Sequence, residues 1–340
     1  MSKIVCFGEI MMRLNPPGNL RYVQATAFEA SYAGGEANVA VSLANYGIQA
    51  SYVTKVPKHE LGQCAVNSLR RFGVDTAHIL RGDDRLGIYF VEKGASQRAS
   101  KVIYDRADSA VALASPEEYD WDAILEGASW FHFTGITPAL SENAAKACLD
   151  AVQTAKKRCV MVSCDLNYRN KLWSREQAQK VMSTLMPYVD VCISNEEDAY
   201  DVFGIKAAET DVHKGELSRD GYISVARQLS ERFGFSKVAI TLRGSLSASD
   251  NTWSGLLYAN NMAFFAPEYR IHIVDRVGGG DSFAGGLLYA LMEGYDGQIA
   301  VNFAVAASCL KHSIEQDFNL VSKSEVRALM AGNASGRVQR

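Results

Sequence analysis

The chain has 340 residues and is 48% hydrophobic, enough for one large α/β domain or two ordinary ones with a sizeable core. A formal net charge of −3 provides no basic field for nucleic acid, and no run approaches the roughly 20 apolar residues that span a bilayer. We therefore expect a cytoplasmic protein that binds a small molecule and has no nucleic-acid or membrane partner. Seven cysteines without CxxC spacing predict reduced thiols, and the spacing of the six histidines does not indicate a zinc site.

The first part of the chain predicts alternating strands and helices. Residues 3–7 form an apolar run that ends at Gly8, which indicates a buried first strand. Gly34, Gly35 and Asn38 then introduce a helix of small residues at 39–46. A ligand could lie there against bare backbone, with Asn38 donating and accepting hydrogen bonds; a tight turn before a closely packed helix is an equally supported interpretation. A strand at 51–56 and a helix at 62–72 continue the alternation that is typical of a parallel sheet.

A predicted hairpin interrupts this alternation. The β-rich segments 87–91 and 100–104 are separated by polar residues, as in two antiparallel strands. Tyr104 and Arg106 fall on one face if the second strand continues that far, and Tyr89 can face them from the first. On a flap over a small-molecule site, this cluster would recognise an anion, with Arg106 binding a carboxylate bidentately. A solvated stacking surface is the alternative interpretation.

Polar residues follow the next predicted strands, which lie at about 130–134, 159–164, 189–193 and 237–242. Ligands of open α/β sheets bind at the carboxyl ends of such strands. The residues concerned are Asp165, Asn167 and Arg169 after the second of these strands, Asn195 and Asp198 after the third, and Arg243 and Gly244 after the fourth. The acids after the third strand could either cap the next helix or hold a hydrated magnesium ion.

The remaining segments complete an α/β pattern. Helices are predicted at 142–157, 221–233 and 299–312 and from Ser324 onward, and a hairpin at 253–258 with 262–265. Residues 206–220 are predicted to form a loop, and residues 331–340 a frayed tail.

A glycine-rich motif near the C-terminus combines an anion site with a carboxylate. Gly278, Gly279 and Gly280 directly precede Asp281 at the start of a predicted helix, where unpaired N–H groups bind anions. Asp281 would repel a phosphate unless it takes the proton from a hydroxyl that attacks that phosphate. The alternative is an Asp-capped helix after a flexible turn.

Together, these motifs resemble the ribokinase-like (PfkB-type) carbohydrate kinases over nearly the whole chain. The resemblance rests on the order of four features, namely Gly34-Gly35-x-x-Asn38, the inserted flap, Asn195-x-x-Asp198 and Gly278-Gly279-Gly280-Asp281. Within the family, the site is most similar to the 2-keto-3-deoxygluconate kinase subgroup at Tyr89, Tyr104, Arg106, Asp165, Asn167 and Arg169.

The resemblance implies a single ribokinase-like domain over residues 1–340. Its fold would be a doubly wound, mostly parallel sheet flanked by helices, with a small β-sheet lid built from about 10–33 and 86–107. The implied reaction is ATP-dependent transfer of the γ-phosphoryl group to a hydroxyl of a sugar acid, 2-keto-3-deoxy-D-gluconate giving its 6-phosphate. Because lid strands expose their edges, the resemblance also implies a homo-oligomer that pairs its lids.

The resemblance implies a role for each candidate residue. Asp281 would be the base, and the N–H groups of Gly278, Gly279 and Gly280 would bind the γ-phosphoryl oxygens. Sugar hydroxyls would be held by Gly34, Gly35 and Asn38, and the keto-acid with its carboxylate by Tyr89, Tyr104, Arg106, Asn167 and Arg169. The nucleotide would contact Asn195, Thr241, Arg243, Gly244, Gly278 and Gly280. Mg²⁺ would be held, through water, by Asn195 and Asp198, and a monovalent cation, K⁺, would be held with the help of Asp275.

Three alternatives stay open at this level. Fructokinase, or another sugar kinase of the same family, would use the same catalytic residues on a neutral sugar. A catalytically silent sugar- or nucleotide-binding protein is disfavoured because Asp281 is intact. A dinucleotide-dependent dehydrogenase is disfavoured because Gly8-Glu9-Ile10, rather than GxGxxG, follows the first predicted strand.

Overall fold

The computed structural model describes residues 2–195, 197–206 and 219–333. Most of the predicted loop at 206–220 and of the predicted tail at 331–340 therefore lies outside the described residues. Within the described ranges, no helix is both long enough and apolar enough to cross a membrane.

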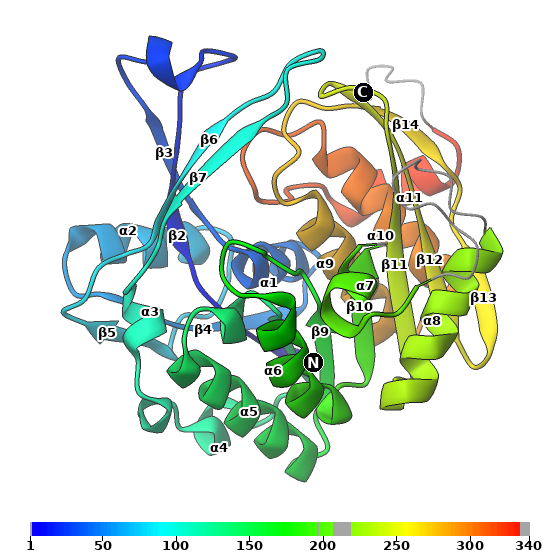
Figure 1. The fold of residues 1–340 in the computed structure, drawn as a ribbon, viewed down its shortest axis with the longest axis horizontal. Helices are drawn as coiled ribbons and strands as arrows, with labels where there is room; N and C mark the ends of the chain where they lie inside the picture. The colour runs from blue at the N-terminus through cyan, green and yellow to red at the C-terminus, as the bar shows by residue number, and fades with distance from the viewer. Residues whose placement is uncertain (1, 196, 207–218, 334–340) are drawn as a thin grey trace.

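The main sheet has ten strands in the described part of the chain (Figure 1). From one edge to the other, its strand order is β13-β12-β11-β10-β9-β8-β1-β4-β5, and β14 pairs with β12. The bounds are β1 (Lys3–Phe7), β4 (Gln49–Pro57), β5 (Ile79–Gly82), β8 (Trp130–Thr134), β9 (Met161–Asp165), β10 (Val191–Asn195), β11 (Lys237–Ser245), β12 (Asp250–Ala259), β13 (Met262–Phe265) and β14 (Tyr269–His272). All pairs from β5 to β11 are parallel, and those made by β12 are antiparallel.

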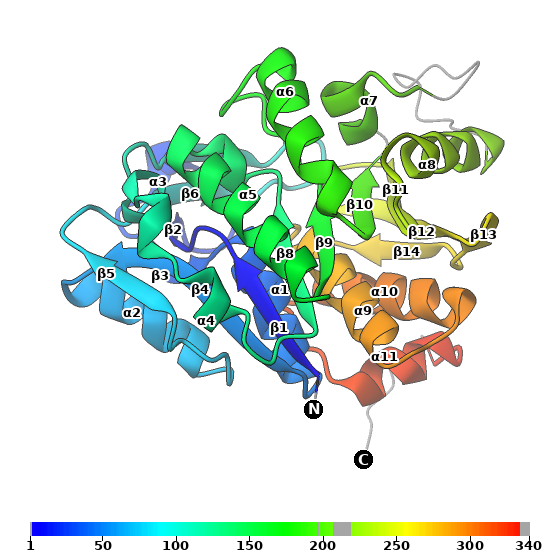
Figure 2. The same cartoon turned by 90° about the horizontal axis from the view of Figure 1, so that it is seen from below.

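Helices cover both faces of this sheet, as Figure 2 shows. One face carries α1 (Gly35–Asn45), α2 (Glu60–Arg70), α9 (Gly279–Met292), α10 (Gly297–Lys311) and α11 (Lys323–Met330). The other carries α5 (Glu142–Lys157), α6 (Arg175–Leu185), α7 (Asp198–Phe203) and α8 (Arg219–Phe233), with the short α3 (Ala110–Leu113) and α4 (Trp121–Ile124) toward one edge. A separate hydrophobic cluster fills the space on each face. The predicted doubly wound, mostly parallel α/β fold is confirmed.

Helix α9 packs closely on both of its neighbours because it begins with small residues. A Cβ added at Gly285 would lie 2.6 Å from the Ser42 side chain in α1, and one at Gly286 would lie 3.0 Å from the backbone of Ala304 in α10. Larger residues would push the helices apart. This close packing holds the N-terminus of α9 at the carboxyl ends of the central strands.

A second sheet of four strands stands apart from the main one (Figure 1). Its order is β3 (Glu29–Ala33), β2 (Met11–Asn15), β6 (Ile88–Glu92) and β7 (Lys101–Asp105). β6 and β7 form the predicted hairpin, in which Tyr89 is the register partner of Tyr104. We call this four-stranded sheet the lid sheet. Its strands fall within the ranges 10–33 and 86–107, and the fold prediction of a small separate sheet is confirmed.

The structure differs from the sequence expectation in several boundaries. Helix α1 begins at Gly35 rather than at residue 39. Strand β11 continues to Ser245 because it pairs with β12 over nine residues. Helix α6, which the sequence analysis did not assign, begins at a capping box formed by Ser174 and Gln177.

Candidate active site

A cleft of about 530 Å³ lies where the lid sheet faces the carboxyl ends of the main strands. Nearly all of the predicted site residues line it. They are Gly34, Gly35, Asn38, Tyr89, Tyr104, Arg106, Asn167, Arg169, Asn195, Asp198, Thr241, Arg243, Gly278, Gly279, Gly280 and Asp281. Gly244 and Asp275 are not among the lining residues.

The three glycines before Asp281 form a helix start at which Gly279 is buried and Gly280 is exposed. Gly278 adopts φ +80°, and an added Cβ would lie 2.1 Å from the Asp317 carbonyl oxygen, so glycine is required there for two reasons. At Gly280, an added Cβ would meet open space. No side chain caps the start of α9. The Gly279 N–H donates 3.3 Å to the Arg276 carbonyl oxygen, so the N–H groups of Gly280 and Asp281 are the ones available to an anion in the cleft.

Asp281 lies at the third position of α9 and is held by Asn38 on α1. Asn38 Nδ2 donates a hydrogen bond of 2.6 Å to Asp281 Oδ2. Among the described residues, the buried Asn38 Oδ1 has no hydrogen-bond partner. The backbone approaches closely at Gly34, where an added Cβ would lie 1.9 Å from the Glu9 carbonyl oxygen. Asn38 thus fixes the carboxylate and keeps one acceptor oxygen for a hydroxyl donor.

The surroundings of Asp281 suit a general base. Burial raises the pKa of Asp281 to about 6, while the hydrogen bond from Asn38 and the charge of Arg169 oppose the rise. A carboxylate with this pKa remains mostly ionised near pH 7 and accepts a proton more readily than an exposed aspartate. The structure therefore places a carboxylate with a raised pKa at the start of α9, where a base would be needed.

The lid wall of the cleft carries the predicted anion-recognition cluster. The Tyr89 and Tyr104 rings stack with centroids 6.1 Å apart, and the Arg106 guanidinium lies 5.5 Å from the Tyr104 ring centroid. Arg106 is also paired inside the protein, since Nε donates 2.8 Å to Glu9 Oε2 and Nη2 donates to the same oxygen. Glu9 orients the guanidinium, and in the described chain Nη1 makes no protein hydrogen bond. The sequence analysis treated Arg106 as free for a ligand and did not identify Glu9.

The acids at the ends of β9 and β10 gather around Arg169. Burial raises the pKa of Asp198 to about 6 and that of Asp165 well above its usual range, and Arg169 opposes both shifts. Asn195 Oδ1, rather than an acid, accepts 2.8 Å hydrogen bonds from the N–H groups of Glu197 and Asp198 at the start of α7. The capping role is therefore filled by Asn195, which also donates 3.0 Å to Asp198 Oδ2.

These oxygens fit a hydrated Mg²⁺ better than a fully protein-bound one. Asn195 and Asp198 supply the hard oxygen atoms that Mg²⁺ prefers. However, the described residues contain no group of three or more His, Cys, Asp or Glu side chains that could hold a metal ion. Most ligands of such an ion would be water and the phosphates of a nucleotide.

Two more arginines, Arg243 and Arg276, line the cleft. Arg243 lies on β11, next to the Thr241 position that pairs with Asn195, and Arg276 precedes the glycine motif. The pKa of Arg276 is lowered by burial and by the charge of Arg243. Two guanidinium groups so placed would be stabilised by an anion between them. The sequence analysis named Arg243 and overlooked Arg276, although its position two residues before the glycine motif was a usable signal.

Gly244 serves the sheet rather than the cleft. It lies inside β11, not in a loop, and an added Cβ would be 2.4 Å from the Thr252 hydroxyl oxygen on β12. The neighbouring strand therefore accounts for glycine at this position.

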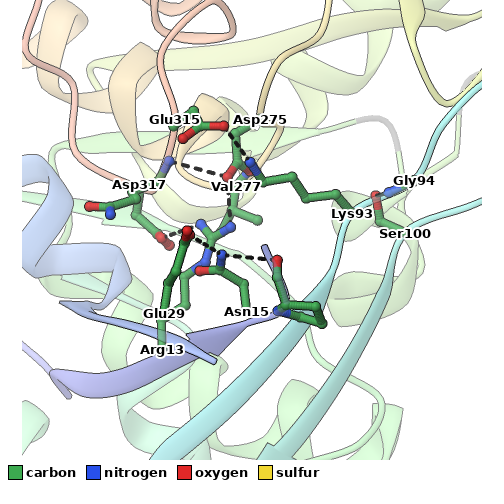
Figure 3. Close-up of polar contacts among 12 residues, drawn as sticks. Arg13, Asn15, Glu29, Lys93, Gly94, Ser100, Asp275, Val277, Glu315 and Asp317 are labelled. Atoms are coloured by element: carbon green, nitrogen blue, oxygen red, sulfur yellow. Dashed lines mark hydrogen bonds and ion pairs between the residues drawn. The ribbon is translucent and has the colours of Figure 1, made fainter. Parts of the chain in front are cut away.

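Behind the glycine motif, Asp275 is bound by an arginine from the lid sheet. Arg13 on β2 is fully buried, with Nη2 2.6 Å from Asp275 Oδ2 and Nη1 2.7 Å from Asp317 Oδ1 (Figure 3). The Tyr89 hydroxyl donates 2.8 Å to the other oxygen of Asp317. Arg13 and Asp317 had no sequence signal, because they are 304 positions apart and meet only in the fold.

Comparison with known proteins agrees with this geometry. The model of the pfkB family carbohydrate kinases matches residues 1–315. The chain belongs to this family. This kinase is 50% identical to 2-dehydro-3-deoxygluconokinase from Thermotoga maritima, whose crystal structure superimposes with a TM-score of 0.94 over 97% of this chain and 98% of that one.

Two further relatives of this pfkB family kinase act on sugar acids. A 2-dehydro-3-deoxygalactonokinase from Haloferax volcanii is 35% identical over 98% of both chains. A 2-dehydro-3-deoxygluconokinase from Thermoproteus tenax is 30% identical over 93% of this chain and 90% of the relative. The predicted family and the predicted carbohydrate kinase activity are confirmed.

Proposed function

We propose that this kinase transfers the γ-phosphoryl group of ATP to the terminal hydroxyl of 2-keto-3-deoxy-D-gluconate. The observation that carries the proposal is the lid wall, where Arg106, oriented by Glu9 and flanked by Tyr89 and Tyr104, faces the cleft that also contains Asp281. A carboxylate can accept hydrogen bonds from Arg106, whereas a neutral sugar would leave the guanidinium without an anion. Three similar proteins, all kinases of deoxy keto-acids, support the same substrate class.

The reaction requires alignment, charge neutralisation and a base. Asp281 would accept the proton of the attacking hydroxyl, and Asn38 would orient both partners by donating to Asp281 and accepting from the sugar. The N–H groups around Gly280 would stabilise the charge on the phosphoryl oxygens. When bound, Mg²⁺ would neutralise nucleotide phosphates beside Asn195 and Asp198.

The lid sheet would close the substrate side and join two copies. Both of its outer strands, β3 and β7, lack a further strand partner among the described residues, and Phe28 and Ile103 on or near them are 42% and 53% exposed. Edge strands of this kind are commonly covered by another chain. We expect a homo-oligomer through the lid sheet, which multi-angle light scattering would detect.

A substrate panel tests the proposed activity. ADP release is measured with 2-keto-3-deoxygluconate, its C4 epimer 2-keto-3-deoxygalactonate, fructose and ribose. We expect the two keto-acids to have the highest kcat/KM. The ratio of their kcat/KM values shows which of the two epimers is the preferred substrate. If fructose or ribose is the best substrate, the sugar-acid proposal is wrong and the fructokinase alternative is favoured.

A variant of Arg106 tests whether this arginine recognises the carboxylate of the substrate. Arg106→Met should lower kcat/KM for the keto-acid by roughly 30- to 150-fold, equivalent to about 2–3 kcal/mol for charged hydrogen bonds, and should affect fructose much less. Arg85→Met is the matched control, because Arg85 pairs with Asp105 on the exposed side of the same hairpin. Equal losses on acid and neutral sugar would mean that Arg106 supports the lid rather than the substrate.

A further inference from the structure

A buried lysine ammonium lies directly behind the glycine motif. Lys311, the last residue of α10, is 0% exposed. Its Nζ donates to three backbone carbonyl oxygens, those of Asp275 at 3.2 Å, Gln316 at 2.6 Å and Val277. Three acceptors match the three donors of an ammonium group. The side chain is therefore fully bonded without touching the cleft.

Lys311 completes a charge-balanced cluster. Arg13 pairs with Asp275 and Asp317, and the same two carboxylates favour the charged form of Lys311, against the burial that lowers its pKa. Two cations and two anions are then buried together behind the motif. Removing the ammonium would leave an uncompensated buried negative charge and three carbonyl oxygens without a donor, which is strongly unfavourable.

One of the carbonyl oxygens that Lys311 binds, that of Val277, belongs to the peptide group that leads into the glycine motif. In a trans peptide, the C=O and N–H bonds point in opposite directions. By binding the Val277 carbonyl behind the motif, Lys311 directs the N–H of Gly278 the other way, toward the cleft. Ser308, one turn earlier on α10, holds the Gly279 carbonyl with a 2.7 Å hydrogen bond. Helix α10 thus sets the orientation of two peptide groups of the motif, Val277–Gly278 and Gly279–Gly280.

We propose that Lys311 is a positioning residue that acts as a tethered monovalent cation, so that this kinase needs no added K⁺. A cage of backbone carbonyl oxygens is the environment that proteins use to bind K⁺. In this chain the ammonium satisfies those oxygens, and its charge stays fixed beside the site of phosphoryl transfer. The cation expected from the sequence near Asp275 is then supplied by the protein itself. The kinetic part of this inference rests on the proposed function.

The wild-type enzyme provides the first test. ADP release is measured in KCl, NH₄Cl and tetramethylammonium chloride at one ionic strength of about 0.1 M, because general screening would otherwise differ between the salts. The expected result is the same kcat in all three. Activation of the wild-type enzyme by K⁺ severalfold over tetramethylammonium would overturn the proposal.

The second test converts the tethered cation into an added one. In tetramethylammonium chloride, Lys311→Met should lower kcat by about 10²-fold while changing the KM of the sugar acid little, because misplaced N–H groups act on the transition state. Adding K⁺ or NH₄⁺ should then raise the kcat of Lys311→Met at least about tenfold. Lys156→Met is the matched control, because Lys156 pairs with Asp190 far from the motif. The kcat of this control variant should not respond to K⁺.

A binding measurement separates this inference from the choice of substrate. K⁺ should raise the Tm of Lys311→Met relative to tetramethylammonium at equal ionic strength, and should leave the Tm of the wild type and of Lys156→Met unchanged, since a ligand stabilises only the state that binds it. This result requires no sugar, so it stands even if the substrate panel rejects the keto-acids. If Lys311→Met shows neither a K⁺-specific Tm shift nor K⁺ rescue, Lys311 is structural only and the proposal fails. If the variant does not fold, the wild-type salt comparison still decides.

Discussion

The interaction between Asn38 and Asp281 allows the role of the base to be tested by pH. Burial raises the pKa of Asp281 to about 6. Because a base must be deprotonated, activity should rise with pH through this value, and with that pKa the ionised fraction is about 0.1 at pH 5 and about 0.9 at pH 7. Wild-type kcat/KM should therefore fall by about ninefold between pH 7 and pH 5.

Asn38→Ala should shift the low-pH fall of kcat/KM, the acid limb of the profile, to higher pH. The 2.6 Å hydrogen bond from Asn38 favours the charged carboxylate and so holds the pKa down. A hydrogen bond to a charged group contributes about 1.5 kcal/mol at the lower end of its range, which corresponds to about one pKa unit. We expect the midpoint of the acid limb to rise by about one pH unit, with a smaller rate at every pH because the sugar also loses a contact.

The assay is the kcat/KM profile for the sugar acid from about pH 5 to 9 at saturating nucleotide. Titration of the nucleotide is common to both enzymes and cancels in their comparison. Asn45→Ala is the matched control, because Asn45 lies on the same helix and donates to the Val321 carbonyl away from the cleft. If Asn38→Ala lowers the rate uniformly and leaves the midpoint in place, Asn38 only binds substrate and the reasoning about Asp281 is refuted.

Three further predictions follow from the same geometry. Asp281→Asn should lower kcat by about 10²–10⁴-fold while calorimetry finds nearly unchanged sugar affinity, and wild-type turnover would exclude it as the base. Gly278→Ala should lower the free energy of unfolding by more than about 1 kcal/mol in a urea titration, because Gly278 has a positive φ and an added Cβ would clash with the Asp317 carbonyl. Gly280→Ala should keep the wild-type stability and have a lower kcat. Equal stabilities of the two variants would contradict the structural requirement for glycine at position 278. Arg13→Met should cost about 3–5 kcal/mol by leaving two buried aspartates unpaired, and a neutral effect would show that water replaces the guanidinium.

The architecture was largely predictable because its signals are local. Apolar runs of strand length, glycines at helix starts and serine caps depend on neighbours within a few residues. The strand over 130–134 and the helix over 142–157 were predicted to the residue. The extension of β11 was not, because its last residues are kept extended by pairing with β12 rather than by their own pattern.

The site was predictable as a set of residues but not as a set of contacts. Polar residues after parallel strands converge because all the strands end at one edge of the sheet. This rule brought Asn167, Asn195 and Arg243 into one cleft with Asp281. It did not distinguish a residue that faces the cleft from one that supports the sheet, as the position of Gly244 beside Thr252 shows.

By itself, the sequence determined the fold class and located the glycine motif with Asp281, which we propose as anion site and base, since each depends on short, local patterns. Only the tertiary structure decided how the charges are paired. Glu9 meets Arg106 across 97 positions, and Arg13 from the lid sheet meets Asp275 across 262. Lys311 closes the same cluster from the end of α10. Such pairs form because buried charges must be compensated wherever the chain brings them together, and no local pattern records which partner that will be.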